Sequence, residues 1–463
     1  MTDAAATALL QELTRIVGAA HIRSGADFPA RHLQDAAQLP PETPLALVRP
    51  GTTAEVAAVM ALCHDRAVHV VVQGGLTGLA GGAHPLDGEV ALSLERMNAV
   101  EDVDVIGRSM TVQAGATLQS VQEAAAAAGL HYPVDLGSRG SCTIGGTVAT
   151  NAGGVQVLRY GMTRRQVLGM EAVLPDGRVL SGLNRLTKNN TGYDWKEILI
   201  GSEGTLAAIT RVVLALQPRP SAVQTVLCAC GSTDAAFTLQ RRLEQGFPGG
   251  LLTFEGMWRD YLDITRPALS GPPPFTDLPP LALLIEIGEA GNERPGDALL
   301  ELLAQAMEDG LLSDAVVAQS LSDRGRLWEW REANAEFGRL QPKGLHYDVS
   351  VPRPAMDEAI RRWQASIDAH QPGGRMAIYG HLGDGNLHLA IFPPGDTPID
   401  PALTDPVYHT VAALGGSISA EHGIGTRRRD ALAYSRNDGE RAFMGDLKKF
   451  FDPRGILGAG RIL

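Results

Sequence analysis

Three glycine-rich loops in the first half of the chain constrain its fold more than any other feature. They span residues 73–82, 137–154 and 201–205, and the first follows the apolar run 68–72 directly. Glycine costs backbone entropy, so such loops persist where the backbone approaches another group closely. Successive N–H groups in them form nests for phosphate oxygens. The first loop is not GxGxxG, and GxxxxGK followed by Ser or Thr is absent, which excludes the Rossmann and P-loop patterns. One such loop is more often a tight structural turn, but three together favour a large dinucleotide site.

A second feature is the Asp384-Gly385 pair between two apolar runs, which predicts a two-residue hairpin turn. Counting outward from that turn places His381 opposite His388 on one face. Their Cβ atoms would then lie roughly 5 Å apart, close enough for two imidazoles to hold one metal ion. Glu421 could add a carboxylate oxygen and leave His422 as a base. Three protein ligands with an open fourth position are typical of a catalytic metal site. The alternative, a His–His pair on a sheet surface, stays open at this point.

Bulk composition limits the class of protein. The 463 residues exceed the ~250–300 at which single cores stop growing, so two or three domains are expected. A formal net charge of −12 argues against a nucleic-acid binder. No window approaches ~18 uninterrupted apolar residues, and the N-terminus lacks a basic segment, so we expect neither a membrane span nor a signal peptide. The four cysteines form no CxxC pair and indicate buried, reduced thiols. These features predict a cytoplasmic protein.

Apolar patterning predicts an α+β chain in four parts. Residues 1–44 form a leading helix and connector, 45–220 alternate strands and helices, 221–410 form an α+β domain with an antiparallel sheet, and 411–463 form a C-terminal segment. Strands are predicted at 45–50, 68–72, 225–230 and 281–287, and helices at 53–63, 117–128, 296–308 and 354–369.

Longer motifs show a family resemblance that runs from about residue 45 to the end. The glycine loops resemble those of the vanillyl-alcohol oxidase/p-cresol methylhydroxylase-type flavoproteins. Within that group the chain is similar to the D-2-hydroxyglutarate dehydrogenase/D-lactate dehydrogenase branch. The motifs that carry this likeness are Gly140-Ser-Cys-Thr-Ile-Gly-Gly146, Thr150-Asn-Ala-Gly-Gly154, Leu158-Arg-Tyr-Gly161, Asn190-Thr-Gly-Tyr-Asp194, Gly201-Ser-Glu-Gly-Thr-Leu206, Gly380-His-Leu-Gly-Asp-Gly-Asn-Leu-His388, Glu421-His-Gly-Ile-Gly425 and Asp452-Pro-Arg-Gly-Ile-Leu457.

The resemblance implies a two-part FAD-binding domain of the p-cresol methylhydroxylase type, an α+β substrate (cap) domain with an antiparallel sheet, and a C-terminal segment that returns to the flavin. FAD would be bound non-covalently, because Leu76-Thr77 occupy the loop where some relatives attach flavin through a histidine, and the nearest histidine is His84. The residues expected to bind FAD are Gln73, Gly74, Gly75, Leu76, Thr77, Gly78, Gly82, Pro133, Gly137, Ser138, Cys142, Gly145, Gly146, Thr150, Asn151, Gly153, Gly204 and Ile209.

The resemblance also implies a divalent metal on His381, His388 and Glu421, a ligand set that favours zinc and also suits manganese or iron. The metal would chelate the hydroxyl and C1 carboxylate of a D-2-hydroxy acid and lower the pKa of the hydroxyl. His422 would take the hydroxyl proton while the Cα hydrogen moves to flavin N5, which yields a 2-oxo acid. Arg331 matches the arginine with which the family binds substrate carboxylate, and a bidentate pair suits that role.

Three positions depart from the 2-hydroxyglutarate pattern. Ala335, His346 and Ala390 stand where that branch has threonine, lysine and asparagine. Losing three polar contacts would disfavour a dicarboxylate unless His346 or Lys343 substitutes. The substrate is therefore expected to be D-2-hydroxyglutarate or a related D-2-hydroxy acid.

Other readings stay open from the sequence alone. They are a D-lactate dehydrogenase-type enzyme, an oxidase of the same fold that uses oxygen, a metal-dependent hydrolase, and a non-catalytic subunit. For a dehydrogenase, the expected partner is an electron acceptor such as an electron-transfer flavoprotein or a quinone-linked protein. The oligomeric state is open, a homodimer included. The Arg427–Arg429 run is expected to be a solvated face, with docking of an acidic electron-transfer partner as the smaller alternative.

Overall fold

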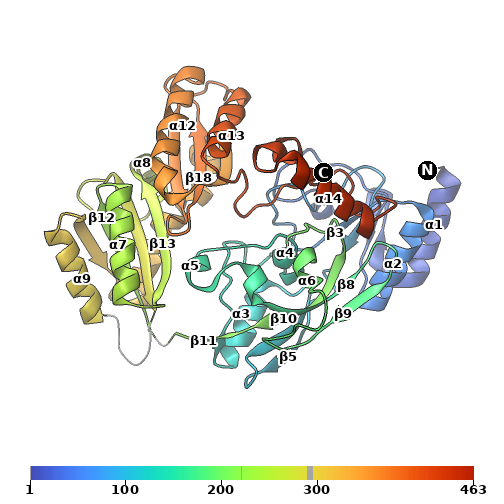
Figure 1. Ribbon diagram of the computed structural model, residues 1–463. Coiled ribbons are helices and arrows are strands. Elements are labelled where there is room, and N and C mark those ends of the chain that lie inside the picture. Colours follow the sequence, from blue (N-terminus) through green and yellow to red (C-terminus); the bar gives the residue numbers. More distant parts are fainter. Residues whose placement is uncertain (1, 221, 289–295) are drawn as a thin grey trace. The chain divides into compact units, whose positions relative to one another are not determined.

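The computed structural model describes residues 2–220, 222–288 and 296–463. This part of the chain forms two compact units, which are coloured along the sequence in Figure 1. Unit 1 comprises Met1–Gly154, Gly161–Arg219 and Glu421–Leu463, and unit 2 comprises Val155–Tyr160 and Pro220–Ala420. The sequence placed boundaries after residues 220 and 410. Residues 1–44, expected as a separate part, are grouped with unit 1.

Unit 1 contains two main sheets. The first has the order β1-β2-β4-β3, and β4 pairs in parallel with both β2 and β3. The second is antiparallel, in the order β5-β6-β10-β8-β9, and the short strands β7 and β11 pair separately. The strands are β1 (Ile22–Arg23), β2 (Ala46–Val48), β3 (Val70–Gln73), β4 (Val90–Ser93), β5 (Val100–Asp104), β6 (Ser109–Gln113), β7 (Leu130–His131), β8 (Val167–Val173), β9 (Val179–Gly182), β10 (Ala208–Ala215) and β11 (Gln217–Pro218).

Hydroxyl caps set where helices of unit 1 begin. Thr52 and Thr117 accept the backbone N–H groups of Glu55 and Ser120, as N-cap side chains do. The helix after Thr117 stops just before Gly129, whose φ of 72° suits a chain leaving a helix. The helices of this unit are α1 (Asp3–Val17), α2 (Thr53–Arg66), α3 (Leu118–Ala127), α4 (Ile144–Ala149), α6 (Lys196–Leu199) and α14 (Asp438–Phe451).

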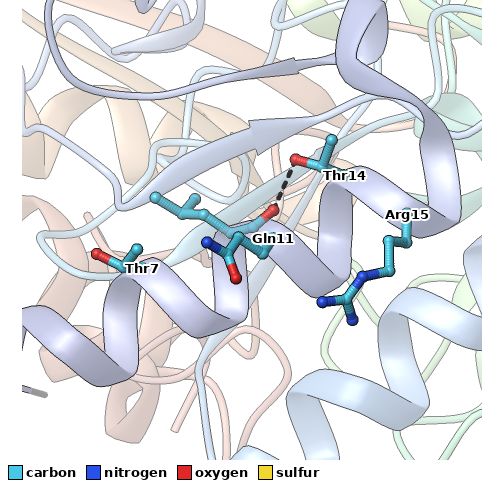
Figure 2. A pocket seen from close by; sticks show the side chains of 5 residues that line it. Thr7, Gln11, Thr14 and Arg15 are labelled. Carbon is cyan, nitrogen blue, oxygen red and sulfur yellow. Dashed lines mark hydrogen bonds between the residues drawn. The ribbon is translucent and has the colours of Figure 1, made fainter.

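Helix α1 is amphipathic. Its inner face buries Leu9, Leu13 and Val17 at helical spacing. Its outer face carries a shallow depression, in which the Thr14 hydroxyl donates to the Leu10 carbonyl oxygen at 2.7 Å (Figure 2). The side chains that line it are Thr7, Leu10, Gln11, Thr14 and Arg15.

The end of the chain returns to β3, the strand that leads into the first glycine loop. The N–H of Val70 donates to the Ile456 oxygen at 2.7 Å, and the N–H of Gly458 donates to the Val70 oxygen at 2.9 Å. Lys448 supports this return by donating to the oxygens of Thr205 and Leu457. The C-terminal segment is therefore part of the same unit as the glycine loops.

Unit 2 is built on one seven-stranded antiparallel sheet in the order β15-β12-β14-β13-β17-β18-β16. Its strands are β12 (Val223–Cys230), β13 (Leu251–Trp258), β14 (Leu281–Gly288), β15 (Leu312–Val317), β16 (Leu345–Ser350), β17 (Arg375–Gly380) and β18 (Asn386–Phe392). Its helices are α5 (Val157–Tyr160), α7 (Thr233–Gly246), α8 (Arg259–Thr265), α9 (Gly296–Glu308), α10 (Leu321–Glu332), α11 (Phe337–Leu340), α12 (Met356–His370) and α13 (Thr404–Ala413).

One face of this sheet packs against α8, α10 and α11. Tyr261 and Trp330 from these helices join Met257, Tyr379 and other strand residues in one buried cluster. The α+β class and the antiparallel sheet predicted from the sequence are confirmed. In the part of the chain that the structure describes, no helix has both the length and the apolar character needed to cross a membrane.

The predicted two-residue hairpin at Asp384-Gly385 is wrong. Strand β17 ends at Gly380, β18 begins at Asn386, and His388 pairs with Tyr379 rather than with His381. The loop is longer because its internal hydrogen bonds hold it. The N–H of Asp384 donates to the His381 oxygen, and its carboxylate accepts from Asn386. The register slips by two residues, and a slip of two returns a side chain to the same face.

Candidate functional site

The first glycine loop offers a row of backbone donors. Within the described part of the chain, no N–H from Gly74 to Gly82 donates to a protein acceptor. Leu76 has a φ of 59°, a left-handed value of the kind that occurs in anion-binding backbone nests. The loop is partly exposed. Amides left unpaired in a partly buried loop favour an anionic ligand, because buried donors are otherwise satisfied.

The first and second loops lie in direct contact. A Cβ on Gly75 would lie 2.0 Å from the Ser141 oxygen, and one on Gly74 would lie 2.5 Å from the Thr143 hydroxyl oxygen. Only glycine permits this approach. Thr143 also begins α4 by accepting the N–H of Gly146. The two loops, although far apart in the sequence, therefore pack against each other and form one glycine-rich stretch in space.

Several predicted flavin residues fall in this stretch. Gly137 is exposed and has open space where a Cβ would be. Thr150 donates to the Gly146 oxygen, and Asn151, with a φ of 48°, accepts the N–H of Arg164. The remaining predicted residues of the second and third loops also lie in unit 1, and Cys142 and Ile209 are buried there.

Gln73 is used internally. Its side-chain nitrogen donates to the oxygens of His32 and Ala83, and its side-chain oxygen pairs with His32 Nδ1 at 2.9 Å. The residue is fully buried. Its side chain therefore fastens the base of the first loop, and the predicted contact of Gln73 with the cofactor stays a prediction.

The third loop anchors the segment that carries Glu421 and His422. The half-buried Glu203 carboxylate accepts the N–H groups of Ile424 at 2.8 Å and Gly425 at 2.7 Å. Burial raises the pKa of Glu203, and these two hydrogen bonds oppose the shift. Glu203 therefore holds the backbone two and three residues beyond His422.

Arg428 fastens the same segment. It is 7% exposed and donates to the Gly423 oxygen at 3.2 Å. The expectation that Arg427–Arg429 forms a solvated face is therefore wrong at Arg428. The carboxylate of Glu421 accepts the N–H of Gly154 at 2.7 Å, which ties the start of this segment to the end of the second glycine loop.

The glycine loops fit an FAD diphosphate. They supply unpaired amides, hydroxyl groups and close-packed glycines, and they contain few charged residues, as expected where backbone dipoles bind phosphate.

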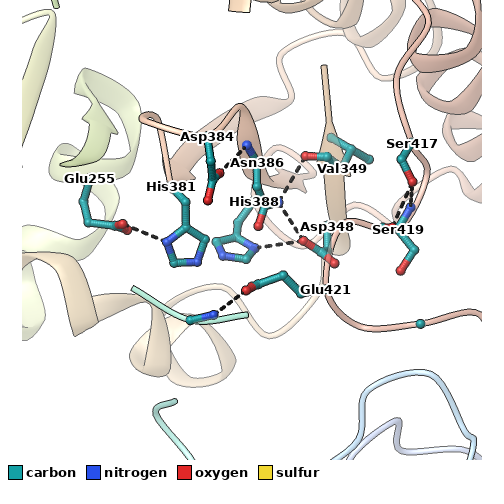
Figure 3. Close-up of polar contacts among 12 residues, drawn as sticks. Glu255, Asp348, Val349, His381, Asp384, Asn386, His388, Ser417, Ser419 and Glu421 are labelled. Atoms are coloured by element: carbon teal, nitrogen blue, oxygen red, sulfur yellow. Dashed lines mark hydrogen bonds and ion pairs between the residues drawn. The ribbon is translucent and has the colours of Figure 1, made fainter. Parts of the chain in front are cut away.

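The histidine pair lies on one face of the unit 2 sheet (Figure 3). The ring centroids of His381 and His388 are 5.4 Å apart, and a nitrogen of each ring lies within 4.8 Å of the other. Each Nδ1 faces a buried carboxylate: His381 lies 2.7 Å from Glu255, and His388 lies 3.7 Å from Asp348. A carboxylate at Nδ1 favours the tautomer whose lone pair is on Nε2, as in metal-binding histidines. This arrangement fits a divalent metal bound by both rings.

Arg331 belongs to the same cluster. Its Nε donates to the second oxygen of Glu255 at 2.7 Å, and its guanidinium lies 5.1 Å from the ring centre of Tyr379. Within the described residues, its two terminal amines donate to no protein acceptor. Burial alone would raise the pKa of Glu255, but His381 and Arg331 lower it to about 2. Arg331 is thus a fixed cation with a donor fork available to a carboxylate.

Glu255, Asp348 and Tyr379 were not predicted from the sequence. Glu255 stands alone as a carboxylate in the apolar strand Leu251–Trp258, and that isolation was the available signal. Burial raises the pKa of Tyr379 to about 12, so its hydroxyl stays neutral beside the His388 ring at a centroid distance of 5.0 Å.

His346 lies at the outer edge of the same sheet face. It is exposed on the edge strand β16, pairs with the buried Ala390, and contacts the rings of Phe337 and Phe392 at centroid distances of 6.0 and 5.8 Å. Ala335 is exposed. Away from the histidine pair, this face is therefore aromatic and aliphatic, with His346 as its polar side chain.

Glu421 and His422 open the last segment of unit 1. Ala420, the residue before them, ends unit 2, and its N–H donates to the Asp348 oxygen at 3.2 Å. The residue that directly precedes Glu421-His422 is therefore held by the backbone of Asp348, whose carboxylate faces His388.

Comparisons with known proteins identify both parts of the chain. Residues 44–182 match the family model of the FAD binding domain, and residues 219–462 match that of the FAD linked oxidases, C-terminal domain. Among curated proteins, the chain is 39% identical to a D-2-hydroxyglutarate dehydrogenase of Xanthomonas citri pv. viticola, over 90% of this chain and 89% of that one. It is 36% identical to a D-2-hydroxyglutarate–pyruvate transhydrogenase of Saccharomyces cerevisiae, over 89% and 85%.

Solved structures agree on the fold. A p-cresol methylhydroxylase matches with a TM-score of 0.77 at 16% identity, covering 100% of this chain and 97% of that one. A 4-ethylphenol oxidase of Gulosibacter chungangensis matches with a TM-score of 0.76 at 18% identity, covering 100% and 98%. The predicted family resemblance and fold class are confirmed. The chain belongs to the FAD-linked oxidase family, in the group that contains the D-2-hydroxyglutarate dehydrogenases, and is an FAD-dependent oxidoreductase.

Proposed function

We propose that this enzyme oxidises a D-2-hydroxy acid to the 2-oxo acid, with D-2-hydroxyglutarate as the first candidate. The observation that carries the proposal is the cluster in unit 2. Arg331 and His381 share the buried Glu255, and His388 lies beside His381. A 2-hydroxy acid presents a carboxylate and a hydroxyl, and this cluster offers a partner for each. Named relatives that act on D-2-hydroxyglutarate support the same substrate class.

Arg331 would bind a substrate carboxylate. Glu255 occupies its Nε, and the terminal amines form a donor fork that matches a carboxylate. The Tyr379 ring beneath the guanidinium limits its movement. The arginine therefore orients the substrate before reaction.

His381, His388 and Glu421 would hold a divalent cation, for which zinc is the best candidate because the ligands are two imidazoles and a carboxylate. When bound, the cation would supply positive charge at the substrate hydroxyl and lower its pKa. Glu255 and Asp348 orient the two rings. Glu421 is covalently joined to Ala420, which hydrogen-bonds the strand that carries Asp348.

His422 would accept the proton of the hydroxyl, a general-base role that contributes ~10²–10⁴-fold. Glu203 and Arg428 restrain the residues that follow it. FAD, when bound, supplies the acceptor for the hydride that leaves the substrate Cα. The unpaired amides of the first glycine loop would bind its diphosphate. The electrons would then pass to an acceptor such as an electron-transfer flavoprotein or a quinone-linked partner.

The residues that would contact the rest of the substrate decide whether D-2-hydroxyglutarate or a more apolar acid is preferred. Ala390 offers no hydrogen bond, and its neighbours on that face are Phe392 and Ala377. A second carboxylate running along this face would have His346 as its partner. The match of the FAD binding domain argues against the metal-hydrolase alternative.

The experiment is anaerobic mixing of the metal-replete protein with matched D- and L-2-hydroxy acids while the flavin band is followed. The panel contains 2-hydroxyglutarate, lactate and an acid with a larger apolar side chain. Bleaching by D-isomers alone is expected. Bleaching by no member of the panel, despite bound flavin, would refute the proposed reaction.

A further inference from the structure

Glu255 is a carboxylate where the strand pattern calls for an apolar residue. Strand β13 is buried along almost its whole length, and Glu255 is 1% exposed. Met257 pairs with Tyr379 across the neighbouring strand, and continuing this register by two residues brings Glu255 opposite His381. Its position on the sheet therefore directs it towards the histidine pair.

The two oxygens of Glu255 serve different groups. One lies 2.7 Å from His381 Nδ1, and the other accepts from Arg331 Nε at 2.7 Å. Burying a carboxylate is costly unless both oxygens are paired, so neither partner can move without exposing that cost. The distance between Arg331 and His381 is thereby fixed by the length of one carboxylate.

We propose that Glu255 is a positioning residue that couples the substrate-carboxylate anchor Arg331 to the metal-ligating His381. This inference rests on the proposed function. It adds that zinc affinity and substrate affinity both depend on one buried side chain, Glu255, which would contact neither the zinc ion nor the substrate. A 2-hydroxy acid has its hydroxyl and carboxylate at a fixed separation, and a rigid Arg331–Glu255–His381 unit would match that separation.

Glu286 shows what a purely structural carboxylate looks like in the same sheet. It is 1% exposed on the adjacent strand β14, and it pairs with Arg324 and accepts from Trp328 and Thr225. None of these partners belongs to the predicted site. Glu286 is therefore a matched control for the burial, charge and sheet position of Glu255.

The test compares the flavin-bound full-length Glu255→Gln and Glu286→Gln proteins with the wild type. After metal removal, Zn²⁺ is titrated against a chromogenic chelator, and the substrate concentration for half-maximal bleaching is measured with metal restored. Glutamine keeps the size but loses the charge and one acceptor. Disturbing the outer partner of a metal ligand lowers metal affinity ~10–100-fold. We expect a loss in this range for Glu255→Gln with weaker substrate binding and unchanged flavin content, and wild-type values for Glu286→Gln.

The outcomes separate the two ideas. Wild-type zinc and substrate affinity in Glu255→Gln would overturn the role of Glu255 and leave the proposed function standing. If the His388→Ala variant binds zinc as tightly as the wild type does, the proposed metal site and the coupling are both refuted. If Glu255→Gln loses its flavin or its secondary structure, Glu255→Asp replaces it. The shorter side chain keeps the charge but cannot span both contacts, so the same weakening is expected, and its absence would overturn the proposal.

Discussion

Replacing Glu203 by glutamine should loosen the segment that carries His422 without removing the flavin. The carboxylate accepts two backbone N–H groups, from Ile424 at 2.8 Å and Gly425 at 2.7 Å. Glutamine can accept only one of them and turns an NH₂ group towards the other. A hydrogen bond to a charged group contributes about 1.5–3 kcal/mol. Losing it corresponds to a roughly 10- to 150-fold shift in the equilibrium between the hydrogen-bonded segment and its locally opened form.

Two readouts test this. Amide hydrogen exchange at Ile424 and Gly425 should accelerate by a factor in that range, and anaerobic flavin bleaching by substrate should slow, while the flavin content stays at the wild-type level. Glu171→Gln is the matched control in the same unit, because the Glu171 carboxylate also accepts two hydrogen bonds, but from the hydroxyls of Thr53 and Thr210. Wild-type exchange and bleaching in Glu203→Gln would show that this segment is held by other contacts and would refute the reasoning.

Three further predictions concern the base, the metal and the thiols. His422→Ala should keep its flavin but reduce it ~10²–10⁴-fold more slowly with substrate, because the proton acceptor is gone; rapid bleaching would exclude His422 as the base. A chelator should abolish turnover while the yellow colour remains, and zinc should restore it; full activity after verified metal removal would contradict the metal role. All four cysteines are buried, and burial raises the pKa of Cys63 to about 12, so a thiol reagent at pH 8 should label the native protein slowly and four thiols after unfolding; rapid labelling of the native protein would contradict this burial.

Local patterns predicted several of the individual elements. The helix expected at 296–308 matches α9, and the helix expected at 117–128 matches α3 with Thr117 as its cap. The helix expected from residue 354 begins at Met356, because Arg353–Ala355 forms a tighter turn. Capping and apolar spacing are local, so the sequence reveals them directly.

The hairpin register illustrates where local reasoning failed. Asp384-Gly385 resembles a two-residue turn, but the loop is set by hydrogen bonds of His381 and Asp384 that no turn rule anticipates. The placement of the two histidines on one face survived only because the register error was two residues.

Long-range pairing explains the residues that were missed. Glu255 and His381 are separated by 126 residues in the chain, and they meet only because β13 pairs with β17. Arg428 reads as one of three adjacent charges, yet the fold buries it against the Gly423 oxygen. The cofactor contact of Gln73 stays a prediction, but its side-chain bonds to His32 and Ala83, which lie 41 and 10 residues away, were not anticipated.

The most direct test of the central claim is an anaerobic single turnover with D-2-hydroxyglutarate carrying hydrogen or deuterium at C2. The account predicts that the flavin band bleaches, that one 2-oxoglutarate forms per flavin reduced, and that deuterium slows the bleaching. Bleaching without 2-oxoglutarate, or bleaching at a rate that deuterium at C2 leaves unchanged, would contradict transfer of the C2 hydrogen from the substrate to the flavin.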